Sequence, residues 1–302
     1  MTLLRGTVLE RDGSVYRVAT EQGVVRAVLR GKAKRGSARV VVGDHVRLDA
    51  ESGVADAFGI SQVEERHSLL ARRVPDGRGT RPVAANVDEV LVVTATVDPL
   101  PIPQLIDRLL VVAAANDLAA ALVLNKTDLD PGDELADRFQ RAGYPVFRTS
   151  VRTGAGLEPL KERLAGRVTV VAGPSGAGKS SLLNALEPGL ELRTGEISAR
   201  IRRGANTTVS AVMVPVGQDA FIVDTPGFSD VGLWGIDPSD LPRCFPEMHP
   251  LLGFCRYPDC RHIGEPGCAV AAAVERGEVQ ADRMESYRVL LAELEDAPRH
   301  WE

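Results

Sequence analysis

The sequence lacks features that a membrane or secreted protein would need. No segment of its 302 residues approaches the ~20 consecutive apolar residues of a membrane span. Residues 1–10 do not show the charged and then apolar pattern of a signal peptide. The formal net charge of -5 argues against a surface that coats nucleic acid throughout. These absences predict a cytoplasmic protein with no membrane partner.

Cysteine is scarce, and all of it lies in one short stretch: Cys244, Cys255, Cys260 and Cys268. Two disulfides are one interpretation, but a reducing compartment favours free thiols or a metal site. The last three cysteines and His262 form the pattern C-x4-C-x-H-x5-C, and three thiolates with one imidazole suit a tetrahedral Zn²⁺. Disulfides would leave His262 unexplained. Cys244 is then left over, as a small buried thiol.

The N-terminal part reads as a small β-barrel. The apolar fraction of 44% and the charged fraction of 25% are ordinary for a globular chain, and the length allows two or three domains. Short apolar runs alternate with glycine-bearing turns at residues 6–9, 15–19, 24–29 and 40–48. This spacing favours an OB-type barrel, in which the basic loop 30–39 would grip an oligonucleotide. The alternative is a solvated basic loop on an ordinary barrel.

The remainder of the chain predicts an α/β domain and a smaller C-terminal domain. An arginine-rich stretch, residues 66–81, is interpreted as a linker or mobile loop. Strand-like and helix-like runs then alternate, which indicates a mostly parallel sheet with helices on both faces. The strands are expected at 87–95, 120–124, 145–150, 168–172 and 220–223, and the helices at 102–115, 133–142, 157–164, 181–186 and 282–294. We expect domains at 1–65, 66–230 and 231–302.

A phosphate-binding loop follows the expected strand 168–172. The residues that fit G-x-x-x-x-G-K-S, with the serine after them, are Gly173, Pro174, Ser175, Gly176, Ala177, Gly178, Lys179, Ser180 and Ser181. Glycines let successive backbone N–H groups point at phosphate oxygens, and the following helix adds its positive N-terminus. Lys179 would neutralise the β- and γ-phosphates, and the Ser180 hydroxyl would coordinate Mg²⁺.

A second phosphate-side element follows the expected strand 220–223. Asp224, Thr225, Pro226 and Gly227 form D-T-P-G. A carboxylate at the end of a strand beside the phosphate loop can reach Mg²⁺, commonly through water, and the Gly227 N–H can sense the γ-phosphate. The pattern alone would indicate only a turn, but in a chain with a phosphate loop it favours a nucleotide hydrolase.

The base-recognition element is N-K-T-D, formed by Asn125, Lys126, Thr127 and Asp128 at the end of strand 120–124. An aspartate can accept both the ring N–H and the exocyclic amine of guanine, and adenine lacks that donor pair. Asn125 can meet the other edge of the base, and the Lys126 stem can pack along it. The element resembles N-K-x-D of the GTPase superfamily, which disfavours a kinase or an ATPase. The alternative is a polar loop at a strand end.

The order of these motifs is rearranged. In ordinary members of the superfamily the phosphate loop comes first, whereas here N-K-T-D precedes it, as a circular permutation would produce. Ser150 and Val151 lie in a loop that looks like the short serine-bearing loop whose backbone touches the guanine oxygen. An N-terminal barrel, a permuted GTPase core and a C-terminal Cys/His cluster together resemble the bacterial ribosome small-subunit-dependent GTPase family RsgA, also called YjeQ.

The resemblance implies a function and its cofactors. It implies a GTPase that binds GTP or GDP, Mg²⁺ with the nucleotide, one structural Zn²⁺, and the small ribosomal subunit with its rRNA. The expected activity is GTP hydrolysis during late subunit maturation or assembly-factor release, by a monomer. The alternative is a GTP-gated RNA- or protein-binding scaffold in which hydrolysis is incidental.

One segment departs from the family pattern. Phe228 follows D-T-P-G where many GTPases have the glutamine that orients water. The family's G-R-H-T-T would supply a histidine instead, but residues 204–208 read G-A-N-T-T, so Asn206 takes that position. An amide can orient water, but it cannot relay a proton as imidazole does. We assign Mg²⁺ and γ-phosphate contact to Thr208, with Thr207 as a neighbour that could exchange with it. We expect slow turnover that the ribosomal partner raises. The expected catalytic set is Lys179, Thr208, Asn206 and Gly227.

Overall fold

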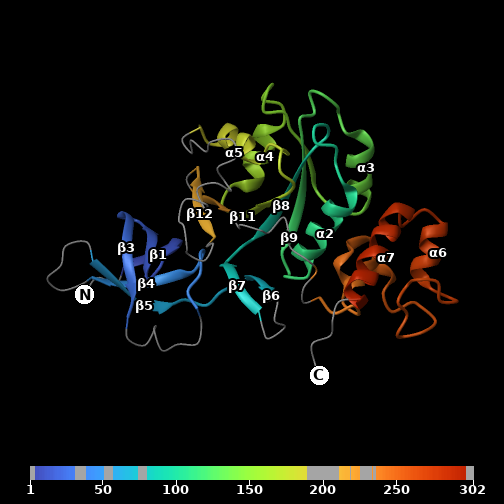
Figure 1. Cartoon of the computed structure of the whole chain (residues 1–302), viewed down its shortest axis with the longest axis horizontal. Coiled ribbons are helices and arrows are strands. Elements are labelled where there is room, and N and C mark those ends of the chain that lie inside the picture. Colours follow the sequence, from blue (N-terminus) through green and yellow to red (C-terminus); the bar gives the residue numbers. More distant parts are fainter. Residues whose placement is uncertain are drawn as a thin grey trace.

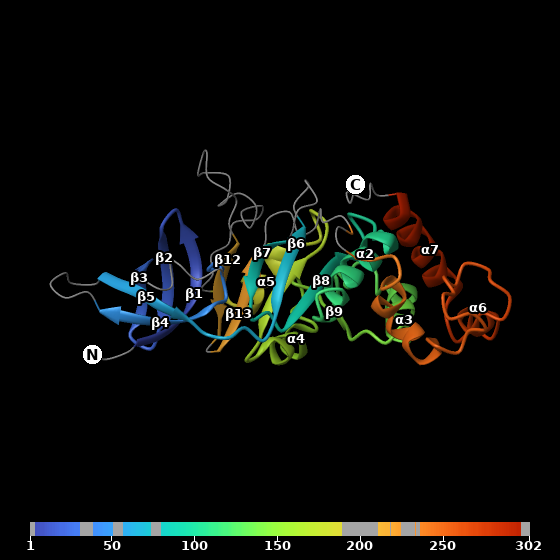
Figure 2. The ribbon, with the colours of Figure 1, turned by 90° about the horizontal axis from the view of Figure 1, so that it is seen from below.

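The computed structural model describes residues 4–30, 39–50, 57–73, 80–188, 211–217, 219–224, 233 and 236–296. A β-barrel, an α/β layer structure and a helical C-terminal part follow one another along the long axis of the molecule (Figures 1 and 2). Among the helices in these ranges, none combines the length and the apolarity that crossing a membrane requires.

The N-terminal strands close into a barrel in the order β1-β2-β3-β5-β4. All neighbours pair antiparallel except β3 and β5, which run parallel. Val8, Val18, Leu48 and Ile60 fill its interior and are fully buried. The predicted OB-type barrel is confirmed. Its strands are β1 (Leu4–Asp12), β2 (Val15–Thr20), β3 (Gly23–Leu29), β4 (His45–Ala50) and β5 (Ala57–Val63).

The expected strand 40–48 is wrong in its first half. β4 begins only at His45, because a turn at Gly43 redirects the chain with a φ of 87°. A Cβ on Gly43 would lie 2.0 Å from the carbonyl oxygen of Ala85, so this close approach requires glycine. The preceding Val42 leaves the barrel and forms a parallel bridge with Ala84. The apolar run 40–42 therefore joins the barrel to the next part of the chain.

The arginine-rich stretch is a β-hairpin in its described part, so its interpretation as a linker or mobile loop is wrong there. β6 (Leu69–Arg73) pairs antiparallel with β7 (Thr80–Ala85). Leu70 and Ala84 are buried in the main hydrophobic core, and the Ala71 N–H donates to the Asn116 side chain at 3.3 Å. The apolar residues of this stretch stand among arginines, which leaves a weak sequence signal for strands.

The central sheet has the order β10-β9-β8-β11-β13-β12. All pairs are parallel except β12 with β13. The five predicted strands are confirmed, whereas β12 was not anticipated because it is an edge strand that contains Pro215. The strands are β8 (Glu89–Ala95), β9 (Ala119–Asn125), β10 (Val146–Arg148), β11 (Val168–Ala172), β12 (Val212–Val216) and β13 (Ala220–Asp224).

Helices cover both faces of this sheet, as predicted. Alternate residues of β8 point to opposite sides: Val90 and Val92 join the core under α2 and α3, and Leu91 and Val93 join the core under α4 and α5. The strand is therefore buried throughout, which explains its continuous apolar sequence. The helices are α2 (Pro103–Ala114), α3 (Asp133–Arg141), α4 (Leu157–Leu164) and α5 (Lys179–Leu186).

The C-terminal part is mostly helical and packs against α2. It contains the 3-10 helices η2 (Leu241–Cys244) and η3 (Pro246–Leu251) and the α-helices α6 (Ala269–Glu275) and α7 (Ala281–Asp296). One continuous core includes Leu9 of the barrel, Leu110 of α2 and Tyr287 of α7. The boundaries at 65/66 and 230/231 stay predictions, and the second lies outside the described residues.

Candidate functional site

The glycine-rich loop 173–180 joins β11 to the first turn of α5. Gly173 has a φ of 136°, and a Cβ there would lie 1.9 Å from the Val93 carbonyl oxygen on the neighbouring strand. Gly178 has a φ of 87°, and a Cβ there would lie 2.4 Å from the Asn125 side-chain nitrogen. Both positions need glycine, since a larger residue would meet strain and a clash. The loop is thereby held against β8 and against the N-K-T-D element.

Lys179, the first residue of α5, and Asp224, the last residue of β13, lie close enough to affect each other's charge. The Lys179 ammonium folds back over the loop and donates to the carbonyl oxygens of Gly173 (2.7 Å) and Pro174 (2.8 Å). Burial lowers the pKa of Lys179, and the nearby Asp224 opposes that shift. Burial raises the pKa of Asp224 to about 7, against the effect of Lys179. A bound cation would favour the ionised form of this carboxylate.

The two nucleotide motifs meet through Asn125, the last residue of β9. Its amide nitrogen donates to the Ala177 carbonyl oxygen in the glycine-rich loop at 3.0 Å. Its amide oxygen accepts a hydrogen bond from the Thr149 hydroxyl at 3.3 Å, and the side chain is buried. Asn125 therefore ties together loops 173–180, 125–128 and 149–154, which are far apart in sequence. One N–H of the amide remains for the expected contact with a base.

The Asp128 carboxylate accepts hydrogen bonds from two side chains and from its own backbone N–H. The Ser150 hydroxyl donates to its Oδ1, and the Arg152 Nε donates to its Oδ2 at 2.7 Å. These hydrogen bonds, Ser150 first and Arg152 second, lower the pKa of Asp128. The carboxylate is therefore ionised at neutral pH and acts only as an acceptor. Arg152 belongs to the loop 149–154 that the sequence places near guanine, but its contact with Asp128 was not predicted.

The other residues of the base-recognition element are fixed by backbone oxygens. Lys126 adopts a φ of 63°, and its ammonium donates to the Asp98 carbonyl oxygen in the loop after β8. The Thr127 hydroxyl donates to the Thr149 carbonyl oxygen at 3.0 Å. Val151 is partly buried against the core under α4 and α5. Pro99, the residue after Asp98, faces Gly176 of the glycine-rich loop. The Lys126 side chain therefore lies near that loop.

The remaining predicted residues divide into two groups. Ser180 and Ser181 lie partly buried in the first turn of α5, and Ser175 and Gly176 are exposed at the tip of the loop. Asn206, Thr208 and Gly227 lie outside the described residues, as do Thr207, Thr225, Pro226 and Phe228. The assignments of water positioning and γ-phosphate sensing therefore stay predictions.

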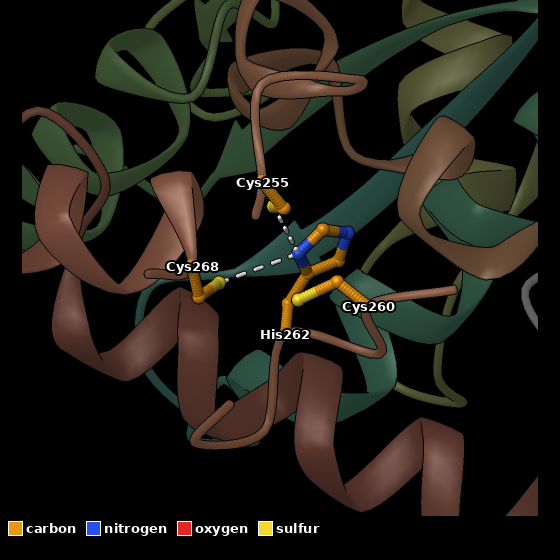
Figure 3. A group of neighbouring side chains, drawn as sticks. All are labelled: Cys255, Cys260, His262 and Cys268. Atoms are coloured by element: carbon orange, nitrogen blue, oxygen red, sulfur yellow. Dashed lines mark hydrogen bonds between the residues drawn. The ribbon is translucent and has the colours of Figure 1, made fainter. Parts of the chain in front are cut away.

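The predicted metal ligands come together in the C-terminal part (Figure 3). The ligand atoms of Cys255, Cys260, His262 and Cys268 all lie within 4.8 Å of one another, so this group could hold a metal ion. His262 Nδ1 faces two of the sulfurs, and the ring is buried. All four cysteines of the chain are free, so the disulfide alternative is wrong, and Cys244 is buried as expected.

Comparisons with known proteins agree with this arrangement. The family model described as RsgA GTPase matches residues 63–234. The chain is 47% identical to the small ribosomal subunit biogenesis GTPase RsgA of Gemmatimonas aurantiaca, over 97% of this chain and 98% of the relative. The namesake protein of Moorella thermoacetica is 40% identical, over 96% and 97% of the two chains.

Two solved structures are also similar. The crystal structure of YjeQ from Thermotoga maritima has a TM-score of 0.80 and 34% identity, covering 98% of this chain and all (100%) of that one. The crystal structure of YloQ, a circularly permuted GTPase, has a TM-score of 0.78 and 28% identity, covering 99% of this chain and 98% of that one. The similarity therefore extends over the barrel, the α/β part and the C-terminal part.

Proposed function

This chain belongs to the RsgA family of GTPases, and on that premise we propose that it binds the small ribosomal subunit and hydrolyses GTP during late maturation of that subunit or release of an assembly factor. The observation that carries the proposal is the hydrogen bond between Asn125 and Ala177, which supports one site with a phosphate end and a guanine end. Small subunits mature in the cytoplasm, so the proposal includes that location. We propose a monomer with no membrane partner.

At the phosphate end, the chain's own groups supply positive charge. Backbone N–H groups of loop 173–180 and the N-terminus of α5 would bind the phosphate oxygens. Lys179, which now donates to two loop carbonyl oxygens, would turn to the β- and γ-phosphates. Mg²⁺ bound with GTP would neutralise further phosphate charge. Ser180 and Asp224 fit it as oxygen ligands, directly or through water, together with the predicted Thr208.

At the guanine end, selectivity would come from Asp128. Its oxygens would accept the ring N–H and the exocyclic amine of guanine, with the Lys126 stem and the 149–154 loop along the base. Adenine offers no such donor pair, so polar groups of the site would stay unpaired with ATP. ATP would therefore bind several orders of magnitude more weakly than GTP. Competition of GTP and ATP for the site tests this selectivity.

Hydrolysis would be slow in the free protein, since Asn206 can orient a water but cannot relay its proton. We expect small subunits to raise the single-turnover rate of GTP hydrolysis by at least about tenfold, which equals ~1.4 kcal/mol of transition-state stabilisation. Quenched-flow measurement with small subunits, and with large subunits as the control, checks this. Fast hydrolysis that small subunits leave unchanged would contradict the assembly-factor role. Subunit binding that depends on GTP without any stimulation would favour the scaffold.

We propose that the Cys/His group is a structural zinc site. Tetrahedral zinc with Zn–S of about 2.3 Å and Zn–N of about 2.0–2.1 Å places sulfur and nitrogen ligands about 3.5 Å apart. The His262 Nδ1 lies 3.5 Å from the Cys255 sulfur and 3.4 Å from the Cys268 sulfur, so the spacing fits that ion. Four protein ligands complete the coordination and leave no position for a reacting water.

Glu265 organises the backbone on both sides of His262. Its carboxylate accepts the N–H groups of Arg261 (2.8 Å), Ile263 (2.9 Å) and Gly264 (3.1 Å). We expect Glu265→Ala to lower zinc affinity by about 10- to 100-fold, because groups that orient ligands contribute on that scale. Competition with a chromogenic chelator measures it, and Glu278→Ala, at an exposed pair with Arg276, is the control. Equal zinc affinity in the two variants would refute the role of Glu265.

A further inference from the structure

We propose that Arg152 is a positioning residue for guanine recognition: it fixes the Asp128 carboxylate in the plane that a guanine base requires. This inference rests on the proposed nucleotide site and gives a specific role to one further residue of loop 149–154. Three observations carry it: the division of donors between the two carboxylate oxygens, the anchoring of the loop that bears Arg152, and the contrast in exposure between the two partners.

The side-chain donors are divided one to each oxygen of Asp128. Ser150 occupies Oδ1, and the Nε of Arg152 occupies Oδ2 at 2.7 Å. Besides these side chains, the backbone N–H of Asp128 donates to the same carboxylate, whose two oxygens offer about four acceptor sites in all. Because the two oxygens have different side-chain partners, rotation of the carboxylate about its last bond would break both hydrogen bonds. The acceptor capacity that remains would receive donors of the guanine edge.

The loop that carries Arg152 is itself anchored. The Thr149 N–H donates to the Leu124 carbonyl oxygen at 2.8 Å, and the Thr153 N–H donates to the Ser150 hydroxyl at 3.2 Å. A Cβ on Gly156 would lie 1.9 Å from the Arg148 carbonyl oxygen, so the end of the loop is pressed against β10. The guanidinium therefore projects from a fixed base, and its position is set by the fold.

The exposure of the pair separates it from an ordinary surface ion pair. The Asp128 side chain is 9% exposed, whereas the Arg152 side chain is 69% exposed. The carboxylate is thus almost entirely covered, whereas the arginine that pairs with it is mostly exposed. An exposed pair alone contributes little to stability. A fixed acceptor at a binding site raises the affinity for the ligand, because the side chain loses less conformational freedom when the ligand binds.

The test compares Arg152→Met and Arg152→Lys with the wild-type chain. GDP binding is followed by displacement of a fluorescent GDP analogue, and IDP, whose base lacks the exocyclic amine, is measured in parallel. We expect Arg152→Met to weaken GDP binding by about three- to tenfold and to weaken IDP binding less. Arg152→Lys should restore part of the loss, since an ammonium keeps the charge but lacks the planar guanidinium.

A pH profile adds a second readout. The hydrogen bonds of Ser150 and Arg152 lower the pKa of Asp128. Loss of the hydrogen bond from Arg152 therefore raises that pKa. GDP binding needs the ionised carboxylate and is lost as the pH falls through the pKa. In Arg152→Met this loss should therefore begin at a higher pH than in the wild type.

The control is Arg148→Met, which removes an exposed ion pair with Asp133 at the end of β10 and leaves Asp128 untouched. It should bind GDP and IDP as the wild type does. An equal loss of GDP and IDP binding in Arg152→Met would mean a general loop role and would overturn the inference. Tighter GDP binding would overturn it too, because Arg152 would then compete with the base. If the wild type bound neither nucleotide, the proposed function itself would fail.

Discussion

Asp107→Asn is expected to lower the free energy of unfolding by about 3–5 kcal/mol, the scale for breaking a buried ion pair. Asp107 is fully buried on α2 and accepts from two guanidinium groups, Arg283 of α7 and Arg138 of α3, the latter at 2.7 Å. The amide keeps the shape of the carboxylate but removes its charge. The two guanidinium groups would then be balanced only in part, by Glu247, 2.6 Å from Arg283, and by the half-exposed Asp282 beside Arg138.

Urea denaturation followed by circular dichroism measures this change. The matched control is Glu293→Gln, which removes the partner of Arg108 on the same helix pair, α2 and α7. There the side chains are 25% and 41% exposed, and the expected loss is below about 1 kcal/mol. If both variants lost the same small amount, the buried cluster would not hold the C-terminal part in place.

The position of this cluster connects stability with the candidate site. Its acidic residue lies on α2, which follows the loop whose Asp98 carbonyl oxygen receives the Lys126 ammonium. Arg138 lies on α3, which follows the N-K-T-D element itself. The metal-bearing part is therefore docked on the two helices behind the guanine end. The barrel contacts the other end of the sheet, where β1 packs beside β12.

The features that the sequence predicted are local ones. The glycine-rich loop, the N-K-T-D element and the Cys/His spacing each lie within a few residues, and their chemistry follows from residue type and spacing. The helices and parallel strands follow from periodicity and continuous apolar runs. By contrast, Asp107 and Arg283 are 176 residues apart, and the sequence around neither residue predicts that the two form an ion pair.

The misses have the same physical cause. The β6–β7 hairpin buries Leu70 and Ala84 against a core built by distant segments, so its own apolar pattern is too weak to predict strands. Arg152 was expected in the serine-bearing loop without a role of its own, and only the fold places it 2.7 Å from the Asp128 carboxylate. Tertiary contacts determine the hairpin and the role of Arg152, whereas the motifs could be recognised from their local sequence.

Lys179→Met is expected to lower kcat/KM for GTP by about 10²- to 10³-fold, the loss typical of removing one preorganised group that stabilises transition-state charge. The ammonium is partly buried and lies between the glycine-rich loop and Asp224. Burial lowers its pKa, but the negative phosphates of GTP would raise that pKa again and keep the group charged. Methionine keeps the length and packing of the stem without the charge.

Multiple-turnover hydrolysis with small subunits, followed by phosphate release, gives kcat and KM separately. Lys161→Met, on the exposed side of α4, is the control for loss of a positive charge and should leave both constants unchanged. If Lys179 acts mainly on charge that develops during bond breaking, kcat falls more than GDP affinity does. A loss confined to KM would instead place the lysine in ground-state binding, and unchanged kinetics would remove loop 173–180 from the active site.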